Sequence, residues 1–107
     1  MSVPLAVRRY GRGAPLLLLH GLFGSRANWH SIASRLADRF EVLAVDLRNH
    51  GASPHTPAMD YPAMAGDVAS LLDAQGLADA HVLGHSMGGK VAMTLALQMP
   101  EIGRAHV

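Results

Sequence analysis

A serine flanked by glycines at a fixed spacing is the feature of this sequence best suited to chemistry. The stretch Gly84-His85-Ser86-Met87-Gly88 has the spacing G-x-S-x-G, and it lies between an apolar run and a segment of helical periodicity. On a sharp strand-to-helix turn the serine hydroxyl projects beyond the strand end, and flanking glycines avoid the collisions of a Cβ. The next backbone N–H, that of Met87, lies at a helix N-terminus, where the dipole favours a developing oxyanion. Ser86 is therefore a candidate nucleophile.

Two other interpretations of this stretch stay open at this point. Glycine and serine are common in turns, so the stretch could be a structural turn without a chemical role. Gly84 to Val91 also lacks only one residue of the phosphate-binding loop G-x-x-x-x-G-K-[ST], because Val91 stands where that loop needs a hydroxyl for magnesium. Nucleotide binding is thus a further alternative.

The segments around the turn predict strands and helices in alternation. Apolar runs without alternation predict strands buried on both faces at residues 14–19, 40–45 and 80–83. A possible edge strand precedes them at residues 3–9. Helical apolar faces follow the buried strands and comprise Trp29, Ile32, Ala33, Leu36 and Ala37, then Met64, Val68, Leu71 and Leu72, then Val91, Ala92, Leu95, Ala96 and Met99. Asp60 is the expected N-cap of the second helix, with Pro62 in its first turn.

This alternation with short connections predicts an α/β fold with a mainly parallel sheet. Active sites of such sheets lie at the carboxyl ends of the strands. The stretches at those ends are His20-Gly21-Leu22, Asp46 to Ser53, and Ser86. Their common location favours the interpretation of Ser86 as a functional residue over that of a structural turn.

Composition and charge exclude several other classes of protein. The 107 residues suffice for one small domain or part of a larger one, and half of them are hydrophobic. The net charge of +1 gives no electrostatic case for binding nucleic acid or an anionic membrane. The absence of cysteine excludes disulfides and thiolate sites, and no histidine spacing suggests a metal site. Without a signal peptide or a long apolar segment, we expect a soluble cytoplasmic protein that uses no cofactor.

The three motifs resemble those of the α/β-hydrolases in order and spacing. They are His20-Gly21-Leu22-Phe23-Gly24-Ser25, Asp46-Leu47-Arg48-Asn49-His50-Gly51-Ala52-Ser53 and Gly84-His85-Ser86-Met87-Gly88-Gly89. With Tyr61-Pro62-Ala63-Met64-Ala65 between them, they look most like the small bacterial acyl esterases of the YbfF type. The resemblance implies that Ser86 is the nucleophile, that the N–H groups of Leu22 and Met87 form the oxyanion hole, and that Phe23 lines the substrate pocket. It implies a serine hydrolase for small-molecule esters or thioesters.

The sequence departs from the family where the other catalytic residues are concerned. The family's triad runs in the order serine, acid, histidine, yet only Glu101 and His106 follow Ser86 as candidates, and Glu101 ends the helix after the turn. We therefore expect the N-terminal portion of an α/β-hydrolase fold, with the C-terminal half and the lid absent. Such a chain would be inactive alone, or a binding module completed by a partner. It would also leave an edge of strand 80–83 bare and be marginally stable.

The last residues are expected to be foreign to the domain. Residues 1–101 form the expected N-terminal part of a single domain. Glu101 to Val107 can be back-translated into the opening of a common short-read sequencing adapter, so residues 102–107 are interpreted as a non-native tail. The alternative is that Ala105 to Val107 begin a genuine next strand.

Other polar residues have structural interpretations. We expect His20 to hydrogen-bond nearby backbone and shape the oxyanion loop, and His85 to point away from Ser86. Asp46 and His50 are expected to brace the loop after the second strand. The methionines are expected to fill the core rather than to line a binding surface, namely Met59, Met64, Met87, Met93 and Met99.

Overall fold

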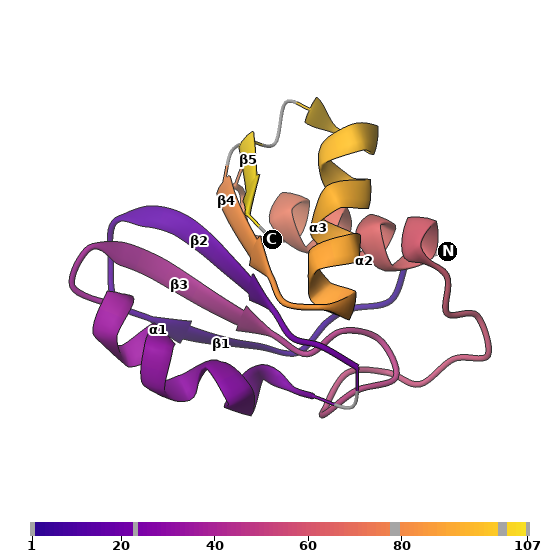
Figure 1. Cartoon of the computed structure of the whole chain (residues 1–107), viewed down its shortest axis with the longest axis horizontal. Coiled ribbons are helices and arrows are strands. Elements are labelled where there is room, and N and C mark those ends of the chain that lie inside the picture. The colour runs from indigo at the N-terminus through magenta and orange to yellow at the C-terminus, as the bar shows by residue number, and fades with distance from the viewer. Residues whose placement is uncertain (1, 23, 78–79, 101–102, 107) are drawn as a thin grey trace.

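The computed structural model shows a five-stranded sheet with helices on both faces (Figure 1). It describes residues 2–22, 24–77, 80–100 and 103–106. The strands are β1 (Val7–Tyr10), β2 (Ala14–Leu19), β3 (Phe40–Val45), β4 (Ala80–Gly84) and β5 (Gly103–His106). The helices are the 3-10 helix η1 (Arg26–Trp29), α1 (His30–Leu36), α2 (Tyr61–Ala74) and α3 (Met87–Gln98).

The sheet has the strand order β1-β3-β2-β4-β5 and is mainly parallel. Strands β2, β3, β4 and β5 run parallel to their neighbours, and β1 alone pairs antiparallel, with β3. At the centre Leu19 lies beside Val45 on one side and Gly84 on the other, so β2, β3 and β4 end at the same edge. The expected α/β architecture, the N-terminal portion of an α/β-hydrolase fold, is confirmed.

Burial on both faces explains the continuous leucine run of β2. Leu17 and Leu19 pack into a core with α2 and α3, whereas Leu16 and Leu18 pack on the other face with Ala33 of α1. Figure 1 shows the same division, with α2 and α3 close together and α1 on the opposite side of the sheet. Packing on both faces therefore fixes the sheet in place, and the sheet positions the loops at its carboxyl edge.

The first strand is shorter than the sequence predicts. The expected strand covers residues 3–9, but only Val7–Tyr10 pairs with β3. The residues before β1 are bound by side chains instead of by a neighbouring strand. Asp67 accepts a hydrogen bond from the N–H of Val3, and the hydroxyl of Ser53 accepts one from the N–H of Ala6. These contacts hold the N-terminal segment along α2 and the loop after β3.

The first helical segment also differs from its prediction. Residues Arg26–Trp29 form the 3-10 helix η1, in which Asn28 and the N-cap Ser25 form a capping box, and the α-helix begins at His30. Ala33 is fully buried, but Ile32 is 45% exposed and so does not lie on the inner face as expected. The second helix agrees with its prediction, because Asp60 caps it through the N–H of Ala63 and Pro62 lies in its first turn.

The edge of β4 is covered, contrary to expectation. The backbone of Gly103–His106 forms β5, which runs parallel to β4 and pairs with its residues Ala80–Leu83. Strand pairing uses backbone groups, which every sequence supplies, and this explains why a segment interpreted as a tail can form a strand. The bare edge that we expected at β4 is therefore absent.

Candidate active site

The turn between β4 and α3 holds Ser86 in a strained backbone conformation. Ser86 has φ 56° and ψ −113°, a region that residues with a side chain rarely adopt. Close packing enforces the turn, since a Cβ on Gly84 would lie 2.2 Å from the carbonyl oxygen of Gly88. A Cβ on Gly88 would lie equally close to the carbonyl oxygen of Leu19. The two glycines of the G-x-S-x-G spacing are thus required by the contact between the turn, α3 and β2.

Ser86 opens into a cavity of about 290 Å³. The residues around it come from the loop after β2, from α2 with the residue before its N-cap, and from the first turn of α3; they are Leu22, Met59, Tyr61, Met64, Ser86, Met87 and Lys90. The side chain of Ser86 makes no hydrogen bond with the helix that it precedes. The hydroxyl is therefore available to a bound molecule.

Leu22 and Met87 line the same cavity as Ser86. Met87 is the first residue of α3, a position whose N–H has no acceptor within its own helix. Leu22 lies on the loop after β2, and this loop passes close to the turn: a Cβ on Gly21 would lie 3.4 Å from the Cβ of Ser86. The structure thus brings the three residues named from sequence together. Phe23 lies outside the described residues.

His20 anchors this loop through both ring nitrogens. Its Nε2 accepts a hydrogen bond from the N–H of Leu47 at 3.0 Å, which leaves Nδ1 to donate to the carbonyl oxygen of Gly21 at 2.7 Å. The side chain is buried, and this burial lowers the pKa of His20 below its usual value. His20 thus hydrogen-bonds nearby backbone, as predicted. Its neutral ring also ties the loop after β2 to the loop after β3 and has no nitrogen left for Ser86.

Asp46 holds the far end of the same loop. Its buried carboxylate accepts hydrogen bonds from the backbone N–H and the guanidinium of Arg26 and from the N–H of Ala52. A Cβ on Gly51 would collide with this carboxylate, and Gly51 has the positive φ of 51° that favours glycine. Asp46 thus braces the loops after β2 and β3, in agreement with its interpretation from sequence.

A buried ion pair fixes the loop after β3 to α2. The Arg48 guanidinium donates to both carboxylate oxygens of Asp67, at 2.6 and 2.8 Å, and to the carbonyl oxygen of Ala58 at 3.0 Å. The hydrogen bonds to Asp67 raise the pKa of Arg48. Ala58 directly precedes Met59, so this pair helps to place one wall of the Ser86 cavity. Sequence analysis missed Asp67, although an acid among the inward positions of a helix was a usable signal.

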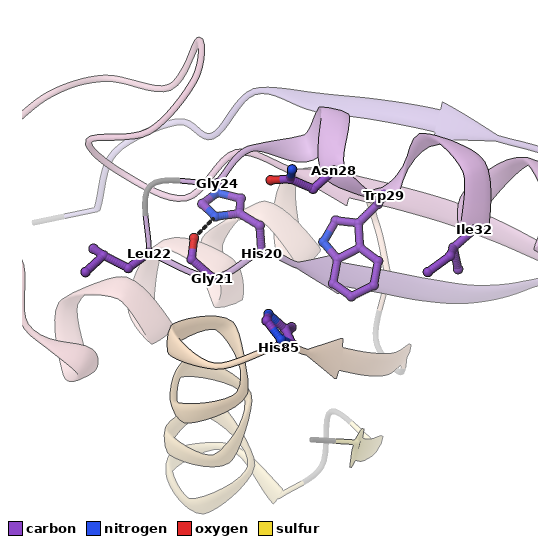
Figure 2. Close-up of a pocket in the computed structure, with 8 residues that line it drawn as sticks. All are labelled: His20, Gly21, Leu22, Gly24, Asn28, Trp29, Ile32 and His85. Atoms are coloured by element: carbon purple, nitrogen blue, oxygen red, sulfur yellow. Dashed lines mark hydrogen bonds between the residues drawn. The ribbon is translucent and has the colours of Figure 1, made fainter.

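A second cavity, of about 470 Å³, is lined in part by the same loop after β2 (Figure 2). In Figure 2 His85 from the turn lies on one side of it, and Trp29 and Ile32 lie on the other. His85 lines this cavity whereas Ser86 lines the smaller one, so the two neighbouring side chains point apart as predicted. Within the described part of the chain, no histidine or acid lines the cavity of Ser86.

The other residues and site types named from sequence are only partly covered by the described residues. Glu101 lies outside the described residues, and His106 belongs to β5. Met64 and Met87 are buried, but Met59 and Met93 are 39% and 47% exposed, so the prediction that all the methionines fill the core is wrong for these two. In the described ranges no cluster of three possible metal ligands occurs. Over the same ranges no helix is long and apolar enough to cross a membrane.

Comparisons with known proteins agree with this geometry. The family model of the alpha/beta hydrolase fold matches residues 14–105. The chain is 50% identical over 82 residues to the esterase YbfF of Escherichia coli, covering 77% of this chain and 32% of that protein. It is 50% identical over 94 residues to the sn-1-specific diacylglycerol lipase ABHD11 of Danio rerio, covering 86% of this chain and 30% of the lipase.

The fold also matches solved structures. The solved structure of a marine microorganism esterase superposes with a TM-score of 0.94 at 46% identity, covering 95% of this chain and 40% of the esterase. The chain thus spans about a third of the length of the curated relatives named above.

Proposed function

Because the chain belongs to the alpha/beta hydrolase fold family, we propose that it is the part of a serine hydrolase that carries the nucleophile, and that this nucleophile is Ser86. The observation that carries the proposal is the position of Ser86. It occupies a strained turn at the end of a parallel strand and opens into a cavity that Leu22 and Met87 also line. Strained residues in cavities at this edge of a sheet are characteristic of catalytic positions.

In the proposed reaction Ser86 Oγ attacks the carbonyl carbon of an ester or thioester. The N–H groups of Leu22 and Met87 donate to the oxyanion of the tetrahedral intermediate, and the N-terminus of α3 adds its dipole. The alcohol or thiol leaves, and water then hydrolyses the acyl-enzyme. Phe23, by the family resemblance, would line the acyl pocket. The proton of Ser86 needs a histidine that the lining of the described cavity does not supply.

Relatives named esterase and lipase support an ester as the substrate of the whole protein. The cavity is small and mainly apolar, which suits a small acyl group. We propose that this activity takes place in the cytoplasm, on small molecules and without a cofactor, nucleic acid or membrane as partner. The net charge of +1 supports this proposal, because it gives no electrostatic case for binding nucleic acid or an anionic membrane.

A second proposal, of a different class, concerns the 107-residue chain by itself. Without a general base the hydroxyl of Ser86 is a weak nucleophile, and the oxyanion donors alone give only a small residual rate. The chain alone would then be a non-catalytic piece, or a module completed by a partner that supplies the base. The third possibility, nucleotide binding, has less support because Val91, in the place of the required hydroxyl, is fully buried.

A chimera tests the role of Ser86. Residues 14–98 of this chain would replace the matching segment of the E. coli esterase, and hydrolysis of 4-nitrophenyl butyrate would be measured. Ser86→Ala should lower kcat at least about a thousandfold, whereas Ser31→Ala, at an exposed serine of α1, should leave it unchanged. Turnover that survives Ser86→Ala would refute the proposal. Turnover by the unmodified 107-residue chain at the rate of the chimera would refute the second proposal.

We also propose the domain boundary at residue 101, with residues 102–107 as a non-native tail. The support is the match of Glu101 to Val107 with adapter codons. Sequencing an independent clone of the source DNA tests it. We expect the codons after Glu101 to differ from those of Ile102 to Val107, and a clone that reproduces them would overturn the boundary.

A further inference from the structure

The cavity of Ser86 contains one ionic side chain, that of Lys90. Lys90 is the only lysine of the chain, since the other eight basic residues are arginines. It lies one helical turn after Ser86 on α3, and its N–H donates to the carbonyl oxygen of Ser86 at 3.1 Å. One turn of α-helix rises about 5.4 Å. The ammonium group therefore lies within reach of a short molecule whose carbonyl carbon is at Ser86.

No carboxylate in the described part of the chain lies within ion-pair distance of this ammonium group. The ion pairs there involve Arg26 with Asp46 and Arg48 with Asp67. The described neighbour of the Lys90 ammonium is the ring of Tyr61, whose centre is 5.9 Å from Nζ. Lys90 thus lines the cavity with its ammonium group beside an aromatic ring, which holds a cation without neutralising it.

The position of Lys90 is unfavourable for the helix itself. A helix N-terminus carries partial positive charge, so a cation in the first turn is repelled and an acid is preferred. The first turn of α3 contains no acidic residue and ends at Lys90. A residue that opposes the local preference of its helix, at the rim of a cavity, suggests a functional role. An anion bound there would offset the repulsion.

The other walls show what would be attached to this anion. Leu22, Met59, Met64 and Met87 are apolar, and the carboxylates of Asp46 and Asp67 are engaged in the loops around them. A short methylene chain would pack against these walls, with the carbonyl carbon at Ser86 and the negative charge at Lys90. A neutral acyl group of the same length would leave the ammonium unpaired.

We propose that this cavity selects an acyl group that ends in a carboxylate, and that Lys90 is the residue that determines this specificity. The inference rests on the proposed function, because it takes the ester carbonyl to be bound at Ser86. The preferred substrates are then monoesters or monothioesters of short dicarboxylic acids. Because Lys90 is exposed to solvent, the expected preference over the neutral analogue is modest, about fivefold in affinity.

Binding to the 107-residue chain tests this without requiring turnover. Reductive methylation with ¹³C-formaldehyde labels Lys90 and the N-terminal amine and preserves their charges, so the Lys90 signal in an NMR spectrum reports directly on the cavity. Monomethyl glutarate and its neutral analogue dimethyl glutarate are titrated separately. We expect the monoester to shift the Lys90 signal and to bind about fivefold more tightly than the diester. Equal affinity for the two would overturn the proposal.

Variants separate the charge from other effects of the side chain. For these, binding is followed through the amide signal of Met87. Lys90→Gln should abolish the preference and Lys90→Arg should retain it, whereas Arg35→Gln, which removes an exposed cation of α1, should leave it unchanged. A preference that persists in Lys90→Gln, or an equal preference for an ester with the carboxylate on its alcohol part, would overturn the proposal. Ser86→Ala should keep the binding preference, so a failure of this inference differs from a failure of Ser86 as nucleophile in the chimera.

Discussion

Replacing Gly88 by alanine should destabilise the chain because α3 packs directly on the end of β2. The added Cβ would lie 2.2 Å from the carbonyl oxygen of Leu19 and 2.6 Å from that of His20, and these are backbone atoms that cannot rotate away. The helix would have to shift, at the expense of the hydrogen bond from the N–H of His85 to the oxygen of Leu19, now 3.0 Å long. Overpacking costs about 1–3 kcal/mol and a lost hydrogen bond about 1 kcal/mol.

Alanine is also a better helix former than glycine by about 1 kcal/mol, which offsets part of this cost. The net expectation for Gly88→Ala is a loss of about 2 kcal/mol in the free energy of unfolding. Gly66→Ala is the matched control, because Gly66 lies within α2 and a Cβ there would lie 4.0 Å from the hydroxyl oxygen of Ser2, an ordinary contact distance. It should gain about 0.5–1 kcal/mol from helix propensity alone.

Thermal unfolding followed by circular dichroism measures both variants. For a domain of this size 1 kcal/mol corresponds to a Tm change of about 4–8 °C. Gly66→Ala should therefore raise Tm by a few degrees, and Gly88→Ala should lower it by about 10 °C. A Gly88→Ala variant as stable as the wild type would show that α3 does not pack on β2 as described. That result would also contradict the geometry described for Ser86.

Three further predictions concern side chains around the site. Arg48→Met should lower the free energy of unfolding by about 3–5 kcal/mol in urea titrations, because it leaves the Asp67 carboxylate buried without its partner; a loss below 1 kcal/mol would contradict this. Ser86→Gly should raise that free energy by about 1 kcal/mol by relieving the positive φ, whereas Ser86→Ala should not. Stability should fall as the pH drops below about 6.5, since burial lowers the pKa of His20 and the unfolded chain binds its proton more readily. His20→Gln should weaken this pH dependence. An unchanged pH profile would show that His20 is not the group responsible for it.

Local patterns in the sequence were sufficient to predict most of the helices and strands. The apolar runs at Ala14–Leu19 and Phe40–Val45 gave both strands their observed bounds, because burial on both faces leaves a continuous apolar signal. Asp60 and Pro62 located the start of α2, because the cap and the fixed φ of proline act within one turn. The prediction succeeded where the structural cause lies within a few residues.

Interactions between distant residues account for the differences. The N-terminal segment is taken out of the sheet by Ser53 and Asp67, which lie about fifty to sixty residues away in sequence. Ile32 has the right periodicity for the inner face but borders the larger cavity instead. A helical pattern records which residues share a face, and not whether another element covers that face.

Some residues of the candidate site could likewise be predicted from local sequence, and others could not. The spacing around Ser86 is local and could be found in the sequence, whereas the set of residues around its cavity depends on the packing of α2 against α3. Lys90 was visible only as part of a possible phosphate loop, although its spacing of four residues from Ser86 places both on one helical face. Met59 and Tyr61 had no local signal, because the loop and helix that present them are fixed by Arg48 and Asp67.

The contact between α3 and β2 links the stability of the chain to its proposed chemistry. The absence of a Cβ at Gly88 lets the helix approach the last residue of β2, and this approach carries Ser86 to the loop that follows the strand. The same loop is held by His20 and Asp46, so Leu22 faces the cavity from a position fixed at both ends. A residue that widens this contact should therefore separate Ser86 from Leu22 before it unfolds the sheet. In the chimera, Gly88→Ala should lower kcat even at temperatures where the protein remains folded.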